Sequence, residues 1–287
     1  MKKKWTVSLT TLLLAAVLLT GCGKSDAGSV GHVGPSGSGG ENGAAPDVQE
    51  PAGDLLDKIT EAGVLVIGTE GTYAPNSYHD EKDNLTGFDV EVARAIAGKL
   101  GVEAKFVEAE WDSLFASMDA GRVDVVINEV EYSQERAEKY DFSAPYTYVH
   151  GALLVAADND DITSFDDLNG RKAAQNLTSS WGQMAESYGA EIVGVDAIAQ
   201  TMEQIVTGRA DATLNAETAF YYYLTVHPDT PVKIVATTDS TTSSRVPVPK
   251  GNERLLAAID QALEELRADG TLSELSQTFF GSDITSE

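Results

Sequence analysis

Two stretches of the sequence decide the fold: VLVIG at 64–68 and FDVEVARAIAGKLGVEAKFV at 88–107. The first is a short apolar run that ends in glycine, which is typical of a buried strand. In the second, an apolar residue recurs at every fourth position, at Phe88, Val92, Ile96 and Leu100. That spacing predicts a helix with one buried stripe. Asp89 is a candidate N-cap for this helix, and Gly101 is expected to end it. We expect the next strand over residues 104–107.

The alternation of strand and helix continues to the end of the chain. We expect further strands near 123–127, 153–156, 173–175, 192–195 and 212–214. We expect further helices near 111–118, 183–188, 197–206, 218–225, 253–268 and 272–280. This order predicts an α/β fold with a mostly parallel sheet that helices cover on both faces.

One short pattern occurs twice in the chain. GRVD at 121–124, with Asn128 after it, recurs as GRAD at 208–211, with Asn215 at the same spacing. Either two lobes share one plan, or a common helix–glycine–strand joint occurs twice. Two α/β lobes would place the carboxyl ends of their strands around a shared cleft, where open sheets bind ligands.

Composition excludes several classes of protein. The chain has 45 acidic and 20 basic side chains, and its formal net charge is −25. Such a chain repels phosphate backbones, so we expect no nucleic-acid partner. Its single cysteine excludes an internal disulfide framework and a cysteine-rich metal site. The four histidines lack metal-ligand spacing and the chain has neither a P-loop nor a nucleophile elbow, so we expect no metal, cofactor or catalytic residue.

The N-terminal residues are typical of a targeting segment. Three lysines at 2–4 precede a short apolar run that ends in LTGC at 19–22. This pattern predicts a signal peptide over 1–21 and resembles the bacterial lipobox, in which the cysteine, here Cys22, is lipidated. The alternative is an ordinary signal peptide with an incidental cysteine. Residues 22–53 are rich in Gly, Ser and Pro, so after the lipidated Cys22 we expect a flexible tether.

A series of motifs, in order, carries a resemblance to a known family. They are GTEGTYAP at 68–75, GFDVEVA at 87–93, WDSL at 111–114, ER at 135–136, YDFSAPYT at 140–147, DGTL at 269–272 and FFG at 279–281. Over about 54–284 the chain resembles the extracytoplasmic solute-binding proteins of polar amino-acid ABC importers (bacterial solute-binding protein family 3). It looks most like the cystine-binding branch.

The resemblance implies a two-lobed, periplasmic-binding-protein-like fold of type II. Its chain would cross between the lobes twice, near 148–152 and 240–246, and these crossings would act as the hinge. Lobe 1 would comprise 54–149 and 246–287, and lobe 2 would comprise 150–245.

The resemblance also implies the ligand-binding residues. Arg136 matches the arginine that binds the ligand's α-carboxylate, although from its charged surroundings alone it would be read as part of a solvated helix face. Thr178, Ser180 and Trp181 match a loop at a helix N-terminus that would bind the other side of that carboxylate. Tyr73 and Trp111 match rings that bracket the ligand side chain, with a core role as the alternative for Trp111. Asn128 and Glu129 match positions that line the cleft.

The sequence departs from the family where the ligand's ammonium group should bind. Ala216 stands where an aspartate is usual, and alanine offers no side-chain acceptor. Glu131 stands where Thr, Ser or Gly is usual. Either Glu131, Glu70 or Glu217 provides the anionic partner from a new direction, or the ligand is not a standard α-amino acid. Arg245 could add a second positive group or lie on the surface.

We therefore expect a monomeric, lipid-anchored binding protein on the extracytoplasmic face of the cell membrane. It would capture a small polar amino acid, cystine as the best candidate, by lobe closure and deliver it to an ABC permease and its ATPase. The alternatives are a ligand-binding subunit that reports to a membrane sensor, and a dehydratase or lyase in which Glu131 and Glu217 act as acid and base.

Overall fold

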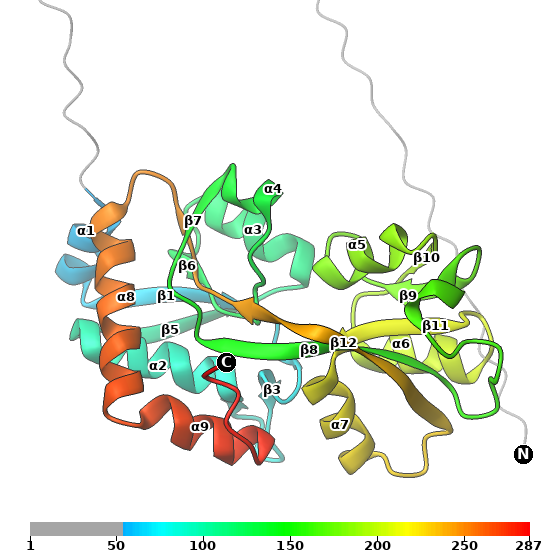
Figure 1. The fold of residues 1–287 in the computed structure, drawn as a ribbon. Helices are drawn as coiled ribbons and strands as arrows, with labels where there is room; N and C mark the ends of the chain where they lie inside the picture. Colours follow the sequence, from blue (N-terminus) through cyan, green and yellow to red (C-terminus); the bar gives the residue numbers. More distant parts are fainter. Residues whose placement is uncertain (1–53) are drawn as a thin grey trace, which may run out of the picture. The chain divides into compact units, whose positions relative to one another are not determined.

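The computed structural model describes residues 54–287 (Figure 1). The expected signal peptide over 1–21, the lipidation of Cys22 and the tether over 22–53 lie outside these residues. The structural statements below concern the described residues alone.

The first lobe is built on a parallel sheet whose strands lie in the order β5-β1-β6. These strands span Glu103–Glu108, Val64–Thr69 and Val125–Val126 respectively. Leu65 and Ile67 of β1 face a cluster formed with α1 (Leu55–Ala62), α2 (Phe88–Leu100), α8 (Glu253–Ala268) and α9 (Thr271–Phe280). Val66 faces the opposite cluster, formed with α3 (Trp111–Asp119). Helices therefore cover both faces of this sheet, as the alternation predicts.

Short elements complete the first lobe around the end of this sheet. An antiparallel sheet joins β2 (Thr72–Tyr73), β3 (Ser77–His79) and β4 (Leu85–Thr86). The one-turn helix α4 (Gln134–Ala137) precedes β7 (Tyr140–Phe142), which pairs antiparallel with β13 (Pro247–Pro249). The late strand β13 thus returns the chain to the first lobe.

The second lobe is built on a sheet in the order β10-β9-β11-β8-β12. These strands span Glu191–Gly194, Lys172–Gln175, Ala212–Ala216, Thr147–Ala156 and Val232–Ser244. The first three are parallel, whereas β8 pairs antiparallel with β11 and β12. The prediction of a mostly parallel sheet is therefore confirmed for the first lobe and wrong for β8 and β12.

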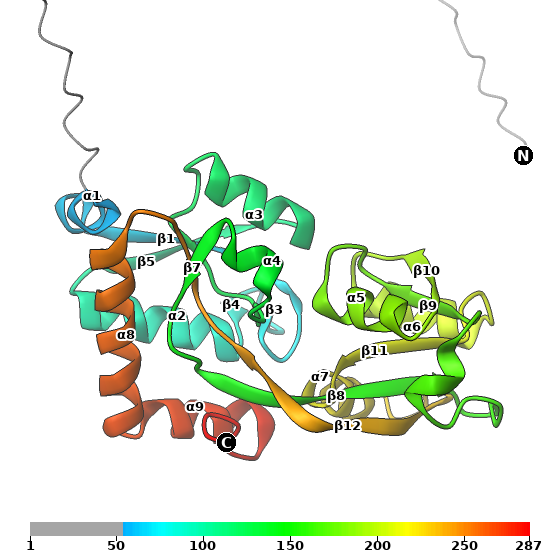
Figure 2. The ribbon, with the colours of Figure 1, turned by 45° about the horizontal axis from the view of Figure 1, so that its top comes forward.

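Helices cover both faces of the second sheet as well. Leu153 and Val155 of β8 pack with α5 (Ser180–Ser187) in one cluster. Leu154 faces the other cluster, with α6 (Ile198–Val206) and α7 (Glu217–Val226). The 3-10 helix η1 (Phe165–Leu168) leads into β9. Figure 2 shows β8 and β12 running side by side from one lobe to the other. The crossings predicted near 148–152 and 240–246 lie on this pair, next to an irregularity in its register between Thr237 and Thr241.

The repeated pattern occupies the same place in the two lobes. Gly121 and Gly208 both have a positive φ, 64° and 66°, directly after α3 and α6. Asp124 Oδ2 accepts a hydrogen bond of 2.8 Å from the backbone N–H of Val66, on the neighbouring strand. Asp211 Oδ2 accepts one of 2.8 Å from Lys172 N–H in the same way. One joint thus ties helix to sheet in both lobes, which favours two lobes on one plan over a coincidence.

The predicted N-cap role of Asp89 is wrong. The helix begins at Phe88 with Gly87 as its N-cap, at a φ of 128° that favours glycine. A Cβ on Gly87 would lie 2.3 Å from the carbonyl oxygen of Asn76, so no other residue fits there. Asp89 is buried and accepts hydrogen bonds from Tyr146 Oη and from the backbone N–H of Glu129. Burial raises the pKa of Asp89 to about 7.

Candidate functional site

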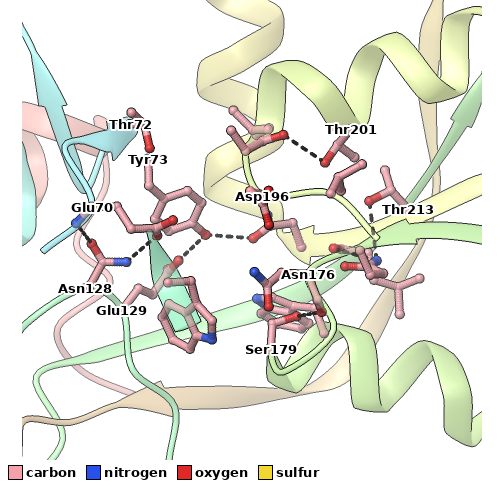
Figure 3. Close-up of a pocket in the computed structure, with 18 of the residues that line it drawn as sticks. Glu70, Thr72, Tyr73, Asn128, Glu129, Asn176, Ser179, Asp196, Thr201 and Thr213 are labelled. Carbon is pink, nitrogen blue, oxygen red and sulfur yellow. Dashed lines mark hydrogen bonds between the residues drawn. The ribbon is translucent and has the colours of Figure 1, made fainter. Parts of the chain in front are cut away.

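A cleft lies between the two lobes, where the carboxyl ends of the parallel strands meet (Figure 3). Its lining residues are Glu70, Thr72, Tyr73, Trp111, Asn128, Glu129, Gln175, Asn176, Ser179, Ser180, Trp181, Val195, Asp196, Ala197, Ile198, Thr201, Thr213, Leu214 and Asn215. Glu70 follows β1 and Asn128 follows β6 in the first lobe. Gln175 ends β9 in the second lobe, and Asn215 lies near the end of β11. This is the position at which open α/β sheets bind ligands.

In the first lobe, Asn128 holds the chain after β1 in place. Its Oδ1 accepts hydrogen bonds from the backbone N–H of Glu70, at 2.8 Å, and from Thr69 Oγ1, at 2.9 Å. Its Nδ2 donates to Glu70 Oε2 at 2.6 Å. Burial raises the pKa of Glu70 to about 7, although the bond from Asn128 lowers it. Asn128 therefore fixes both the backbone and the carboxylate of Glu70 in the cleft.

Tyr73 connects the two lobes across the cleft. Its hydroxyl lies in hydrogen-bond contact with the Glu129 carboxyl of its own lobe and 2.7 Å from Oδ1 of Asn215 in the other lobe. One phenolic hydrogen cannot be donated to both acceptors. Burial raises the pKa of Glu129 to about 8, so this carboxyl is mostly protonated at neutral pH. Glu129 can then donate to Tyr73, which donates to Asn215.

A second set of contacts connects the lobes beside α5. Ser179 caps this helix, since its Oγ accepts a hydrogen bond of 3.0 Å from the backbone N–H of Gly182. The hydroxyl of Thr178 hydrogen-bonds the Asp112 carboxylate of the other lobe. Trp181 both lines the cleft and belongs to the core of the second lobe.

The structure brings most of the predicted site residues to the cleft. Those that line it are Tyr73, Trp111, Asn128, Glu129, Ser180 and Trp181. Those that do not line it are Glu131, Arg136, Thr178 and Glu217. The latter four differ in where they lie.

Arg136 packs against the cleft residue Trp111. Its guanidinium carbon is 5.4 Å from the centre of the Trp111 ring and 5.6 Å from that of Phe115. Nη1 donates to the backbone oxygen of Glu131 at 3.0 Å, and Nη2 donates to that of Thr178, in the second lobe, at 3.1 Å. Burial lowers the pKa of Arg136. Arg136 is thus no solvated helix residue, because it packs on two rings and bonds both lobes.

The carboxylate of Glu131 points to the hinge strands. The side chain is buried, and its Oε1 accepts a hydrogen bond of 2.7 Å from Thr242 Oγ1 on β12. Burial raises its pKa, while the nearby hydroxyls of Ser180 and Thr242 lower it. Glu217 begins α7 and is half-buried outside the cleft lining. Arg245 lies over the Tyr132 ring, 5.5 Å from its centre, and outside the cleft lining.

Sequence reasoning missed Asp196, an acidic residue of the second lobe that lines the cleft. It follows β10 in a turn that carries no motif. The repeated pattern did single out Asn215, which lines the cleft as Asn128 does.

Over residues 54–287 there is no group of three or more His, Cys, Asp or Glu residues that could hold a metal ion. A helix with the length and the apolarity needed to cross a membrane is also not found in this part of the chain.

Known relatives share most of the chain. The family model for "Bacterial extracellular solute-binding proteins, family 3" matches residues 65–282. A probable amino-acid ABC transporter-binding protein of Haemophilus influenzae is 43% identical over 82% of this chain and 91% of its own. The L-cystine-binding protein TcyA of Bacillus subtilis is 39% identical over 90% of this chain and 95% of its own.

Two solved structures are also similar to this chain. An ancestral arginine-binding protein bound to arginine is 35% identical and gives a TM-score of 0.72, covering 76% of this chain and 99% of that one. The L-cystine solute receptor of Neisseria gonorrhoeae, unliganded and open, is 46% identical but gives only 0.57, covering 82% of this chain and 100% of that one. The more similar sequence thus has the less similar structure.

Both predictions that the motifs support, the family and the type II two-lobed fold, are confirmed by these relatives. The chain belongs to family 3 of the bacterial extracellular solute-binding proteins.

Proposed function

We propose that this protein captures a polar amino acid, with L-cystine as the best candidate, and delivers it to an ABC permease. The observation that carries the proposal is the cleft, which is lined by both lobes in a chain 39% identical to an L-cystine-binding protein and 46% identical to an L-cystine receptor. Rings, amides and carboxylates line the cleft, as a zwitterion with an apolar middle requires.

Capture would proceed by lobe closure about β8 and β12. The first lobe would receive the ligand between Tyr73 and Trp111. Arg136, which packs on the Trp111 ring outside the cleft lining, would bind the α-carboxylate through the N–H groups that its two backbone contacts leave free. The loop with Thr178, Ser180 and Trp181 would then close over it. Two contacts support a closure of this kind, because Tyr73 and Arg136, both of the first lobe, each form a hydrogen bond with the second lobe.

We propose that 1–21 is a lipoprotein signal peptide, that Cys22 carries the lipid, and that 22–53 tethers lobe 1 (54–149 and 246–287) and lobe 2 (150–245) at the extracytoplasmic face. A lipid-anchored monomer of this kind would work with a permease and an ATPase. The family's description as extracellular supports this location.

We also propose that the protein is not an enzyme. The relatives above are named as binding proteins. The acid–base pair weighed for a dehydratase or lyase, Glu131 and Glu217, lies outside the cleft lining. A role in reporting to a membrane sensor would use the same cleft and a different partner.

A thermal-shift screen of the standard amino acids, cystine, diamino acids and betaines tests the proposal. We expect L-cystine to raise the unfolding temperature most, because a ligand that binds only the folded state at 100 times its Kd adds about 2.7 kcal/mol of stability. A set in which no amino acid shifts the transition would contradict the proposed function. A shift by another amino acid alone would correct the ligand and keep the class.

A further inference from the structure

The charged side chains that line the cleft are all acidic. Glu70, Glu129 and Asp196 line it, and among the described residues no Lys, Arg or His does. The Glu129 carboxyl is hydrogen-bonded to the hydroxyl of Tyr73. Glu129 is also buried, whereas Glu70 is half-buried with one oxygen outside its bond to Asn128, and Asp196 is exposed. Glu70 and Asp196 are therefore the carboxylates of the cleft that remain for a ligand, and they come from different lobes.

Asp196 does not cap the helix that follows it in its own lobe. It follows β10 and precedes α6, which has Ala197 as its N-cap and no side-chain cap. The backbone N–H of Asp196 donates to Gln200 Oε1 at 3.1 Å, so the turn is held in place. Within residues 54–287 its carboxylate takes part in no hydrogen bond or ion pair, and the side chain is exposed toward the cleft (Figure 3).

Glu70 and Asp196 line the same cleft from different lobes. Asn128 holds the Glu70 carboxylate at 2.6 Å. After burial, repulsion from Asp112 and Asp196 contributes to the raised pKa of Glu70. Asp112 is engaged by the hydroxyl of Thr178, whereas Asp196 is not engaged. Two carboxylates from different lobes thus line one cleft, and a cation between them would relieve their repulsion.

We propose that Glu70 and Asp196 together bind the ligand's ammonium group, one carboxylate from each lobe, in place of the acceptor that Ala216 lacks. This inference rests on the proposed function and names the residues that give it specificity. Ala216 is buried and offers no side-chain acceptor, and Glu131 and Glu217 do not line the cleft. An ammonium between the two carboxylates turns their repulsion into an attraction that holds both lobes. Closure is then favoured by ligands that carry this cation.

Calorimetric titration with a matched pair of ligands tests the proposal. L-Cystine and 3,3′-dithiodipropionate share the disulfide and both carboxylates, but only cystine has ammonium groups. We expect the wild-type protein to bind cystine far more tightly than dithiodipropionate. Asp196→Asn should weaken cystine binding roughly 10- to 100-fold, the usual range for a charged hydrogen bond, and should leave dithiodipropionate binding unchanged or stronger. Asp158→Asn removes the same charge from an exposed turn of the second lobe and should change neither affinity.

The double variant tests whether the two carboxylates share one cation. Glu70→Gln should also weaken cystine binding, and Glu70→Gln/Asp196→Asn should weaken it by less than the product of the single effects. Far-UV circular dichroism checks that every variant is folded. Wild-type affinity for cystine in Asp196→Asn, or strictly multiplicative effects, would overturn the proposal while leaving the proposed function intact. A wild-type protein that binds no amino acid would overturn the proposed function itself.

Discussion

Arg136→Ala is expected to weaken the binding of L-cystine by about 100-fold or more, because a guanidinium that binds a carboxylate through two parallel hydrogen bonds is among the strongest polar contacts in proteins. Contacts with two rings and two backbone carbonyls hold this side chain in place. Its guanidinium is held over Trp111 and Phe115, with N–H groups on the carbonyls of Glu131 and Thr178. Five N–H donors in a planar fork leave others for a ligand.

The unliganded variant should remain folded. Losing the ring contacts and the two hydrogen bonds should lower the free energy of unfolding by about 1–2 kcal/mol, which is small beside the loss of binding. Arg136→Lys keeps the charge without the fork, so an intermediate affinity is expected.

Arg94→Ala is the matched control for this experiment. Arg94 lies in the same lobe, with its guanidinium carbon 5.2 Å from the centre of the Phe106 ring, but on α2 and outside the cleft lining. The Arg94→Ala variant should bind cystine with the affinity of the wild type. Titration calorimetry gives the affinities, and urea unfolding gives the stabilities. Cystine affinity that survives in Arg136→Ala, or a variant that fails to fold, would show that Arg136 serves the structure alone.

The stability of the protein is expected to fall as the pH rises from 5 to 8.5. Two buried carboxyls and one half-buried carboxyl have raised pKa values: the pKa of Glu129 is raised to about 8, and those of Asp89 and the half-buried Glu70 to about 7, each chiefly by loss of hydration. Their ordinary values are 4.5 for Glu and 3.8 for Asp. Between these limits the folded protein binds more protons than the unfolded chain, so raising the pH favours unfolding.

Glu129→Gln isolates the largest of these contributions. A neutral amide has no proton to lose, so this variant should lose less stability between pH 5 and 8.5, by on the order of a few kcal/mol, than the wild type. Glu186→Gln changes an exposed residue of α5 and should follow the wild-type curve. Urea unfolding at pH 5, 7 and 8.5 measures all three proteins. A wild-type stability that rises with pH, or a Glu129→Gln curve parallel to it, would contradict the burial of an ionisable carboxyl at this position.

The parts of the fold that could be predicted are those with a strong apolar period. The helix predicted over 253–268 is confirmed as α8, because its buried residues recur at helical spacing. The strand β12 was missed, since VKIVATTDSTTSS is mostly polar and half-buried and becomes a strand only by pairing with β8. Asp89 was misread as a cap because its burial depends on Tyr146, which is far away in the sequence.

The same distinction holds for the site. Residues within motifs, such as Tyr73 and Trp111, line the cleft. Glu131 was expected to face the cleft, but its contact with Thr242 on β12 comes from the chain's return between the lobes, which no local pattern shows. Asp196 lies in a turn after a short strand and reaches the cleft only through the arrangement of the second sheet. A charged residue in a turn belongs to no apolar period and no motif, so the sequence alone does not indicate that it lines the cleft.

A crystal structure of the protein grown with L-cystine tests the central claim most directly. The account predicts one molecule in the cleft, enclosed by both lobes, with its disulfide between Tyr73 and Trp111 and a carboxylate on Arg136. An empty cleft at saturating cystine, or cystine bound elsewhere on the surface, would contradict it.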